Sequence, residues 1–191
     1  MSAFVVVPGA GAARKETAPP GAAARIDRVV ASPVREARPA GVPGRASRSA
    51  GTTSNGINYH GGPVISAGVN AYVIWYGNWS GDSATTILPT LLTGLGGSRY
   101  YNINTTYHDG ANHIVPNTVR LAGQTTDAYS QGSNNLSASQ IGTIVNSAIS
   151  SGRLPTDTNG LYFVFTSVDV TKSGFLTSYC GWHSNGTLGG V

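Results

Sequence analysis

The stretch VNAYVIWYGNW, residues 69–79, decides the fold. Residues 69–76 are apolar at both odd and even positions and rich in β-branched and aromatic side chains, which is typical of a central strand covered on both faces. Residues 78–83 then have the composition of a turn. A second run of this kind, GLYFVFT at residues 160–166, predicts another buried strand.

A first helix is predicted after the turn. Pro89 would disrupt a helix interior, so we expect the helix to begin near Thr85 or Thr86, with Pro89 in its first turn. Gly96 and Gly97 end it. Its apolar face consists of Ile87, Leu88, Leu91, Leu92 and Leu95.

A second helix has clear signals at both ends. Ser137 and Gln140 form a capping box at its start. Gly152 stops the helix and Pro155 prevents it from restarting. One apolar stripe runs along it and consists of Ile141, Ile144, Val145, Ala148 and Ile149.

Two shorter strands are predicted, at residues 118–123 and at residues 179–183, the latter at the sheet edge. The order is therefore strand, helix, strand, helix, strand, strand. This order indicates a layered α/β domain with a mostly parallel sheet over residues 56–191.

Residues 1–55 differ from the rest of the chain in composition and charge. They are rich in Ala, Pro, Gly and Arg and nearly lack aromatic residues, so we predict a disordered leader. They also hold eight Lys and Arg against three acidic residues, whereas the remainder has four basic and five acidic residues. The basic charge therefore belongs to the leader, which argues against nucleic acid as a partner of the folded part.

The whole chain is poor in charge. Asp, Glu, Lys and Arg make up 10% of it, against about 25% in an average soluble domain. Ser, Thr and Asn supply the polar surface instead, a composition more common outside cells. No stretch approaches the 18 or so apolar residues of a membrane span. Four glycosylation sequons begin at Asn78, Asn104, Asn135 and Asn185.

No metal, cofactor or catalytic residue is assigned from the sequence. His108 and His113 flank Asp109 in YHDGANH, but this spacing matches no common zinc motif and Asp-Gly marks a turn. Ser83 lacks the surroundings of a catalytic nucleophile. With Asp82 it lies where a turn leads into a helix, so we expect capping.

Cys180, the single cysteine, and His183 flank a Gly-Trp pair. Positions 180 and 183 point to opposite faces of a regular strand, so they should not grip one metal or form a catalytic dyad. We therefore interpret this segment as a sheet-edge strand, and we expect the Cys180 thiol to be accessible.

Several stretches in order resemble the EXORDIUM, or phosphate-induced protein, family of plant cell-wall growth proteins and their bacterial relatives. They are YHGGPV at residues 59–64, VNAYVIWYGNW at 69–79, GLYFVFTSVDVTKSGF at 160–175 and CGWH at 180–183. The resemblance runs from about Asn58 to the end of the chain, and residues 1–55 carry none of it.

The resemblance implies a secreted or wall-associated protein of undefined molecular activity. It also implies more chain after Val191, with further cysteines and a His-Glu helix similar to that of zincin metallopeptidases. Plant members typically have a cysteine where this chain has Leu176. On this interpretation residues 56–191 resemble the N-terminal half of a zincin-like domain, without its metal site.

Three functions remain open from the sequence. The first is an EXORDIUM-like protein in extracellular growth or nutrient response, with a wall polysaccharide or an extracellular protein as partner. The second is a zincin-like metallohydrolase fragment lacking its metal-binding helix. The third is a carbohydrate- or wall-binding module that stacks sugars on Trp75, Trp79 and Trp182, which requires exposed indole rings.

Overall fold

The computed structural model describes residues 2–8 and 59–186. After residue 59 the helices and strands follow the predicted order. The elements are β1 (Ser2–Pro8), β2 (Val69–Tyr76), α1 (Ala84–Leu95), the 3-10 helix η1 (Tyr101–Thr106), β3 (Val119–Asp127), α2 (Ala138–Ser150), β4 (Gly160–Thr166) and β5 (Gly181–Gly186).

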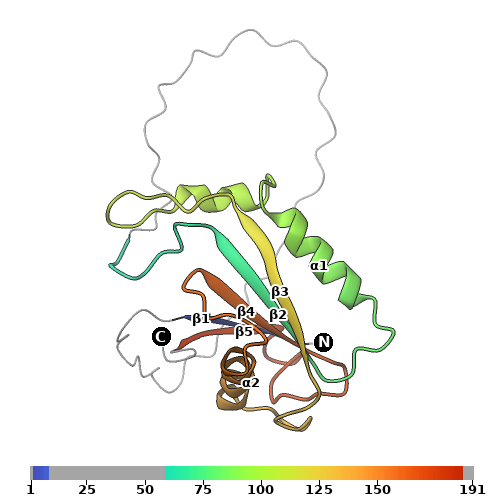
Figure 1. Cartoon of the computed structure of the whole chain (residues 1–191). Coiled ribbons are helices and arrows are strands. Elements are labelled where there is room, and N and C mark those ends of the chain that lie inside the picture. Colours follow the sequence, from blue (N-terminus) through green and yellow to red (C-terminus); the bar gives the residue numbers. More distant parts are fainter. Residues whose placement is uncertain (1, 9–58, 187–191) are drawn as a thin grey trace, which may run out of the picture. The chain divides into compact units, whose positions relative to one another are not determined.

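The strands form one five-stranded sheet in the order β3-β2-β4-β1-β5. The inner strand β2 pairs in parallel with β3 on one side and with β4 on the other, as βαβ connections require. Strand β1 is antiparallel to β4 and parallel to β5. The α/β class is therefore confirmed, with a parallel three-stranded part and two further strands (Figure 1).

Strand β1 is a correction to the predicted leader of residues 1–55. Ser2–Pro8 lie inside the sheet, because SAFVVVP is a short uncharged run with three consecutive valines, which favour extended backbone. The prediction of a disordered leader rested on the composition of all 55 residues and gave this short apolar run no place in the sheet. Residues 9–55 lie outside the described residues, so the prediction of disorder for them stays a prediction.

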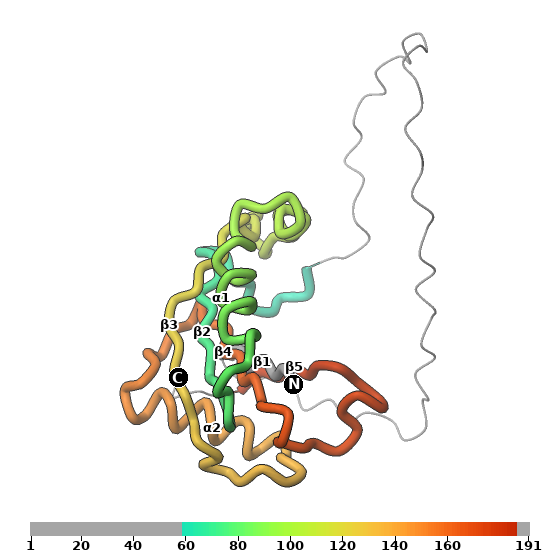
Figure 2. The backbone as a smooth tube through the Cα atoms, turned by 90° about the vertical axis from the view of Figure 1, so that its right-hand side faces the viewer, coloured from blue at the N-terminus to red at the C-terminus, as the bar shows by residue number. Residues whose placement is uncertain are grey.

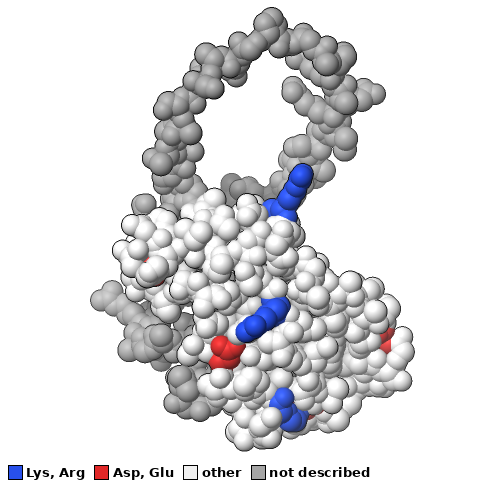
Figure 3. All heavy atoms as spheres, turned by 45° about the horizontal axis from the view of Figure 1, so that its top comes forward, with Lys and Arg blue, Asp and Glu red and all other residues white. Residues whose placement is uncertain are grey.

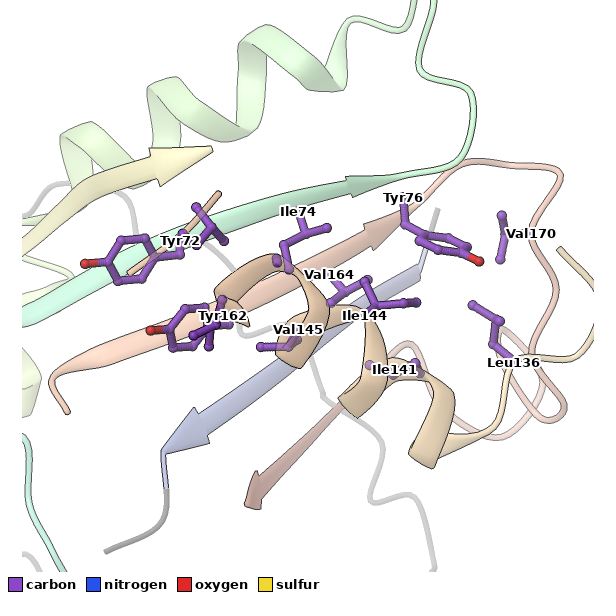
Figure 4. Close-up of a cluster of buried hydrophobic side chains, with 13 residues drawn as sticks. Tyr72, Ile74, Tyr76, Leu136, Ile141, Ile144, Val145, Tyr162, Val164 and Val170 are labelled. Carbon is purple, nitrogen blue, oxygen red and sulfur yellow. The ribbon is translucent and has the colours of Figure 1, made fainter. Parts of the chain in front are cut away.

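Helix α2 covers one face of the sheet. Its capping box at Ser137 and Gln140 is present as predicted. Its apolar stripe packs on alternate residues of β2 and β4, and Tyr72 stacks on Tyr162 with ring centroids 5.0 Å apart. Figure 4 shows this core, which consists of Tyr72, Ile74, Tyr76, Leu136, Ile141, Ile144, Val145, Ala148, Ile149, Leu154, Tyr162, Val164 and Val170.

Helix α1 covers the opposite face. It begins at Ala84, one residue before the predicted start, and Gly97 adopts a φ of 75° just after its end. The core here is smaller and consists of Ala71, Val73, Trp75, Leu92 and Phe165, with Trp79, Leu88, Leu121 and Phe163 packed against it. Ile87 and Leu91, which the sequence placed on the buried face, are 60% and 56% exposed.

Two predicted strands have different bounds in the structure. Strand β3 continues four residues beyond the predicted end at Gly123, and Figure 2 shows it running beside β2. Strand β5 begins at Gly181, because Phe175 and Tyr179 form an isolated bridge that closes a turn before it. No helix among residues 2–8 and 59–186 has the length and apolarity needed to cross a membrane.

Candidate functional site

The carboxyl ends of the three parallel strands meet at one edge of the sheet. Tyr76 at the end of β2 lies in register with Asp127 of β3 and Thr166 of β4. Three loops therefore start side by side, at residues 77, 128 and 167. Open α/β sheets bind ligands at this edge, so its side chains are the first candidates for a site.

A chain of hydrogen bonds links these three loops. The backbone N–H of Asn78 donates to the Ser167 hydroxyl oxygen over 3.1 Å. The Ser167 hydroxyl donates to Asp169 Oδ1 over 2.5 Å, and the Tyr129 hydroxyl donates to Asp169 Oδ2 over 2.6 Å. Each carboxylate oxygen of Asp169 thus accepts one hydrogen bond from a hydroxyl group. One donor, Tyr129, lies in the loop after β3, and the other, Ser167, lies in the same loop as Asp169.

These contacts shift the ionisation of the pair. The hydrogen bond from Ser167, and then the one from Tyr129, holds the pKa of Asp169 below its usual value. The same bond to Asp169 raises the pKa of Tyr129. Around neutral pH this part of the site is therefore a carboxylate between two neutral hydroxyl groups, and the Asp169 side chain lies at the exposed surface.

A second carboxylate lies at the end of β3 and is buried. The two oxygens of Asp127 accept bonds from the Ser130 backbone N–H and the Ser130 hydroxyl, both over 2.8 Å. Nearby, the Tyr76 hydroxyl donates to the Gly132 carbonyl and accepts from the Gln131 N–H. These bonds fix the β3–α2 loop, in which Tyr129 adopts a φ of 61°.

Gly77 allows the loops to come this close. Its φ is 100°, and a β-carbon at this position would overlap the Ser167 hydroxyl. Only glycine satisfies both conditions without strain.

The chemistry of this edge favours binding over nucleophilic attack. A catalytic serine needs an adjacent base with a suitable pKa and donors for an oxyanion. The Ser167 hydroxyl instead donates to a carboxylate whose pKa is lowered, which makes a weak base. The half-buried Tyr129 and the exposed Asp169 carboxylate are suited to exchange hydrogen bonds with a neutral, hydroxyl-rich ligand, whereas Ser167 is buried and orients the carboxylate.

The opposite edge of the sheet holds a structural clamp. The Asn70 amide, the Tyr72 hydroxyl and the Asn159 N–H all donate to the Asp157 carboxylate. Burial works to raise the pKa of Asp157, but these donors outweigh it and the pKa is lowered. Burial, and then the bond to Asp157, raises the pKa of Tyr72 to about 12. The clamp joins β2 to the chain that leads into β4.

The structure does not bring the predicted histidine and cysteine candidates together. His113 Nδ1 lies 2.9 Å from Asp109 Oδ2 across an exposed turn, while His108 contacts the Asp109 carbonyl oxygen. His183 lies on β5, and Cys180 is exposed with a free thiol just before that strand. Residues 2–8 and 59–186 contain no group of three or more His, Cys, Asp or Glu side chains placed to hold a metal ion.

The predicted capping role at the start of α1 belongs to Asp82 rather than Ser83. Asp82 Oδ1 accepts a bond from the Ala84 N–H over 2.9 Å, whereas the Ser83 side chain makes no capping bond.

The three tryptophans do not form an exposed stacking platform. Trp75 is buried, and its indole N–H donates to the Gln124 side chain over 3.0 Å. Trp79 is half-buried, lies edge-on to Trp75 and donates to the Tyr76 carbonyl. Trp182 is half-buried against the α2 core, with the Lys172 ammonium 5.9 Å from its ring centroid. Only Trp79 and Trp182 therefore have partly exposed indole rings on which a sugar could stack.

Sequence analysis missed Tyr129, Ser167 and Asp169. Ser167 and Asp169 directly follow the predicted strand at residues 160–166. Open α/β sheets bind ligands at the carboxyl ends of their strands, so this position alone could have marked both residues as candidates. Tyr129 was missed because the predicted strand ended at Gly123, which placed Asp127 and its neighbours in an undefined loop.

Comparison with known proteins identifies the family. The model of the phosphate-induced protein 1 conserved region matches residues 57–189 of this chain. The chain belongs to the phosphate-induced protein 1 family. The match includes every described element except β1, so both sheet edges and the loops at the carboxyl edge lie within the family's conserved region.

Two curated members of the phosphate-induced protein 1 family from Arabidopsis thaliana are similar to this chain. Protein EXORDIUM-like 5 is 35% identical over 137 residues, which cover 66% of this chain and 38% of that protein. Protein EXORDIUM-like 3 is 28% identical over 138 residues, which cover 66% of this chain and 41% of that protein. The chain thus spans about two fifths of the length of these relatives. It is an EXORDIUM-like protein of undefined molecular activity.

No solved structure matches this chain. The expected likeness to the N-terminal half of a zincin-like domain therefore has no support beyond the order of strands and helices, which many α/β domains share.

Proposed function

We propose that this EXORDIUM-like protein is secreted or held at the cell surface, and that it acts in extracellular growth or nutrient response. The observation that carries the proposal is the family match over residues 57–189. The low charge of the folded part supports it. Figure 3 shows a few scattered charged side chains, of which one basic and one acidic lie side by side, on a face that is otherwise uncharged. The exposed surface includes three sequon residues, Asn78, Asn135 and Asn185.

The test is fractionation of cells that express the natural gene with a C-terminal tag. The tagged protein should collect in the medium or the wall fraction, while a cytosolic marker stays inside. In a cell that glycosylates secreted proteins, Ser80→Ala should remove any glycan at Asn78 without affecting the other sequons, since it destroys only that motif. Recovery of the tagged protein in the cytosol alone would contradict the proposal.

A second candidate function is binding of a neutral wall polysaccharide at the carboxyl edge. The observation that favours it is the exposed Asp169 carboxylate, which accepts hydrogen bonds from the Tyr129 and Ser167 hydroxyl groups. Ligand sites commonly use a small number of such polar groups to orient what they bind. The zincin-like alternative has no comparable observation among the described residues.

Sedimentation with insoluble wall polysaccharide tests this second function. Asp169→Asn and Tyr129→Phe should each weaken retention of the full chain severalfold, because each removes one partner of the loop network. Asp109→Asn is the matched control, since it changes an aspartate of the turn at residues 107–115 and should leave retention unchanged. Equal retention of all three variants would rule out this edge as the binding surface.

A further inference from the structure

Strand β5 joins the sheet through β1 alone. The strand order places β1 between β4 and β5, and β5 has no other strand partner among the described residues. Both β4 and β5 lie inside the conserved region at residues 57–189, whereas Ser2–Pro8 lie far outside it. A segment from outside the family region thus fills a place between two strands of that region.

The backbone pairing defines this place. On one side Ser2 to Val6 run antiparallel to β4, with Ser2 opposite Thr166 and Val6 opposite Tyr162. On the other side Ala3 to Pro8 run parallel to β5, with Val5 opposite His183. Adjacent strands lie about 4.8 Å apart, so the axes of β4 and β5 lie about 10 Å apart, which leaves room for one strand between them. Figure 4 shows β1 in this position beside β4. We call the space between the two strands the strand slot.

Both walls of the strand slot have support that does not come from β1. Strand β4 pairs with β2 along its whole length and contributes Tyr162 and Val164 to the α2 core. Strand β5 contributes Trp182, which packs against the same core. Each wall of the slot therefore contacts the α2 core independently of β1.

The occupant has the chemistry of a peptide ligand that adds a strand to a sheet. SAFVVVP is short, uncharged and β-branched, and it ends in a proline, which cannot donate a further ladder bond. Main-chain hydrogen bonds supply affinity in this mode of recognition. Residues 9–58 keep the segment attached to the frame, which raises its local concentration at the slot.

We propose that the strand slot is a binding site for an extended apolar peptide, and that Ser2–Pro8 occupy it as a tethered, exchangeable ligand. The proposal does not rest on secretion or on polysaccharide binding. It implies that the family region accepts a strand from elsewhere, and that in this chain the strand comes from its own N-terminal segment.

Exchange after cutting the tether is the test. A specific protease site is inserted between Pro20 and Gly21 of the full chain, the site is cut, and a labelled peptide of residues 1–10 is added in excess. The peptide should replace the bound segment, and the circular dichroism of the remaining chain should not change. The uncut chain should need at least about tenfold more peptide for the same occupancy, because its own segment competes from the tether.

The matched control peptide carries Val5→Pro. Proline removes one N–H from the centre of the strand, so this peptide should bind at least about tenfold more weakly. Equal binding of the two peptides would overturn the proposal, because it would show adsorption without strand pairing. Release of the segment only when the whole chain unfolds would also overturn it, because β1 would then be an integral strand.

A disulfide readout tests the register in the same cut chain. His183→Cys, combined with Cys180→Ser to remove the natural thiol, should cross-link to a peptide carrying Val5→Cys, since these two positions lie opposite each other. Ser184→Cys lies opposite Val6 and is the offset control. Preferential cross-linking at position 184, or none at either position, would contradict the proposed slot.

Discussion

The two faces of the sheet carry helices with similar apolar stripes, but only one face is sealed. On α2, the side chains of Ile141, Ile144, Val145 and Ala148 are fully buried. On α1, Leu92 is buried while Ile87 and Leu91 remain largely exposed. The difference shows that apolar spacing locates the face of a helix but does not determine how much of that face the neighbouring sheet can cover.

Replacing one isoleucine on each helix by alanine should give the largest difference in the free energy of unfolding. Ile144→Ala should lower the free energy of unfolding by about 2–5 kcal/mol, because it leaves a cavity in the α2 core. Ile87→Ala is the matched control on α1 and should change it by less than about 0.5 kcal/mol. Both values come from denaturant unfolding of the full chain. A loss of similar size for Ile87→Ala would show that something covers this part of α1 in solution.

Two glycines of the α1 segment should have opposite effects when replaced. A β-carbon at Gly96 would lie 2.5 Å from the Val119 carbonyl oxygen and 2.7 Å from its nitrogen, so Gly96→Ala forces β3 and the end of α1 apart. We expect a loss of about 1–3 kcal/mol.

Gly94 is the control for that substitution. It lies inside α1, and a β-carbon added there would have no atom of another part of the chain within 4 Å. Gly94→Ala should therefore stabilise the chain by about 0.5–1 kcal/mol, because alanine has a higher helix propensity than glycine. If Gly96→Ala were neutral in thermal unfolding, the close contact between α1 and β3 would be absent in solution.

The residues just before the two helices differ in capping, so replacing them should change stability by less than Ile144→Ala or Gly96→Ala. Ser137 accepts the N3 backbone N–H of α2, so Ser137→Ala should cost about 1 kcal/mol. The Ser83 side chain caps nothing, so Ser83→Ala should cost less than about 0.5 kcal/mol. Equal losses would indicate that the hydroxyl of Ser83 turns to cap α1 in solution.

The smallest effect at neutral pH concerns Tyr72, at the edge of the α2 core. Its pKa is raised from 10.0, the ordinary value for tyrosine, to about 12 in the folded chain, so between these values the folded state keeps a proton that the unfolded state loses. Stability should therefore fall as pH rises from about 10 to about 12. Tyr72→Phe should reduce this fall and leave the pH dependence near neutrality unchanged. An unaltered alkaline slope would mean that Tyr72 ionises alike in both states.

The sequence predicts elements well where one short-range signal dominates. Strands β2 and β4 are continuous apolar runs, and both have the predicted bounds. Helix α2 follows from its cap, stripe and glycine stop. Strand β1 was missed because its partners lie some 160 residues away, and no local pattern encodes a pairing over that distance.

The candidate site was harder to predict, because its groups come from three loops. Tyr129 and Asp169 are 40 residues apart and meet only because β3 and β4 flank β2 in register. Strand order therefore determines the site, and strand order is a tertiary property. The exposed turn at Asp109 and His113, by contrast, was correctly identified as a turn from its Asp-Gly pair.

The position of β1 in the sheet has a consequence during synthesis on the ribosome. Ser2–Pro8 leave the ribosome well before β4, their partner, which is made some 160 residues later. At about 5–20 residues per second, this interval lasts roughly 8–30 s. During that time a valine-rich segment is outside the ribosome without its partner strand, where chaperones or other nascent chains can bind it. Slower translation should therefore reduce the yield of correctly paired chain.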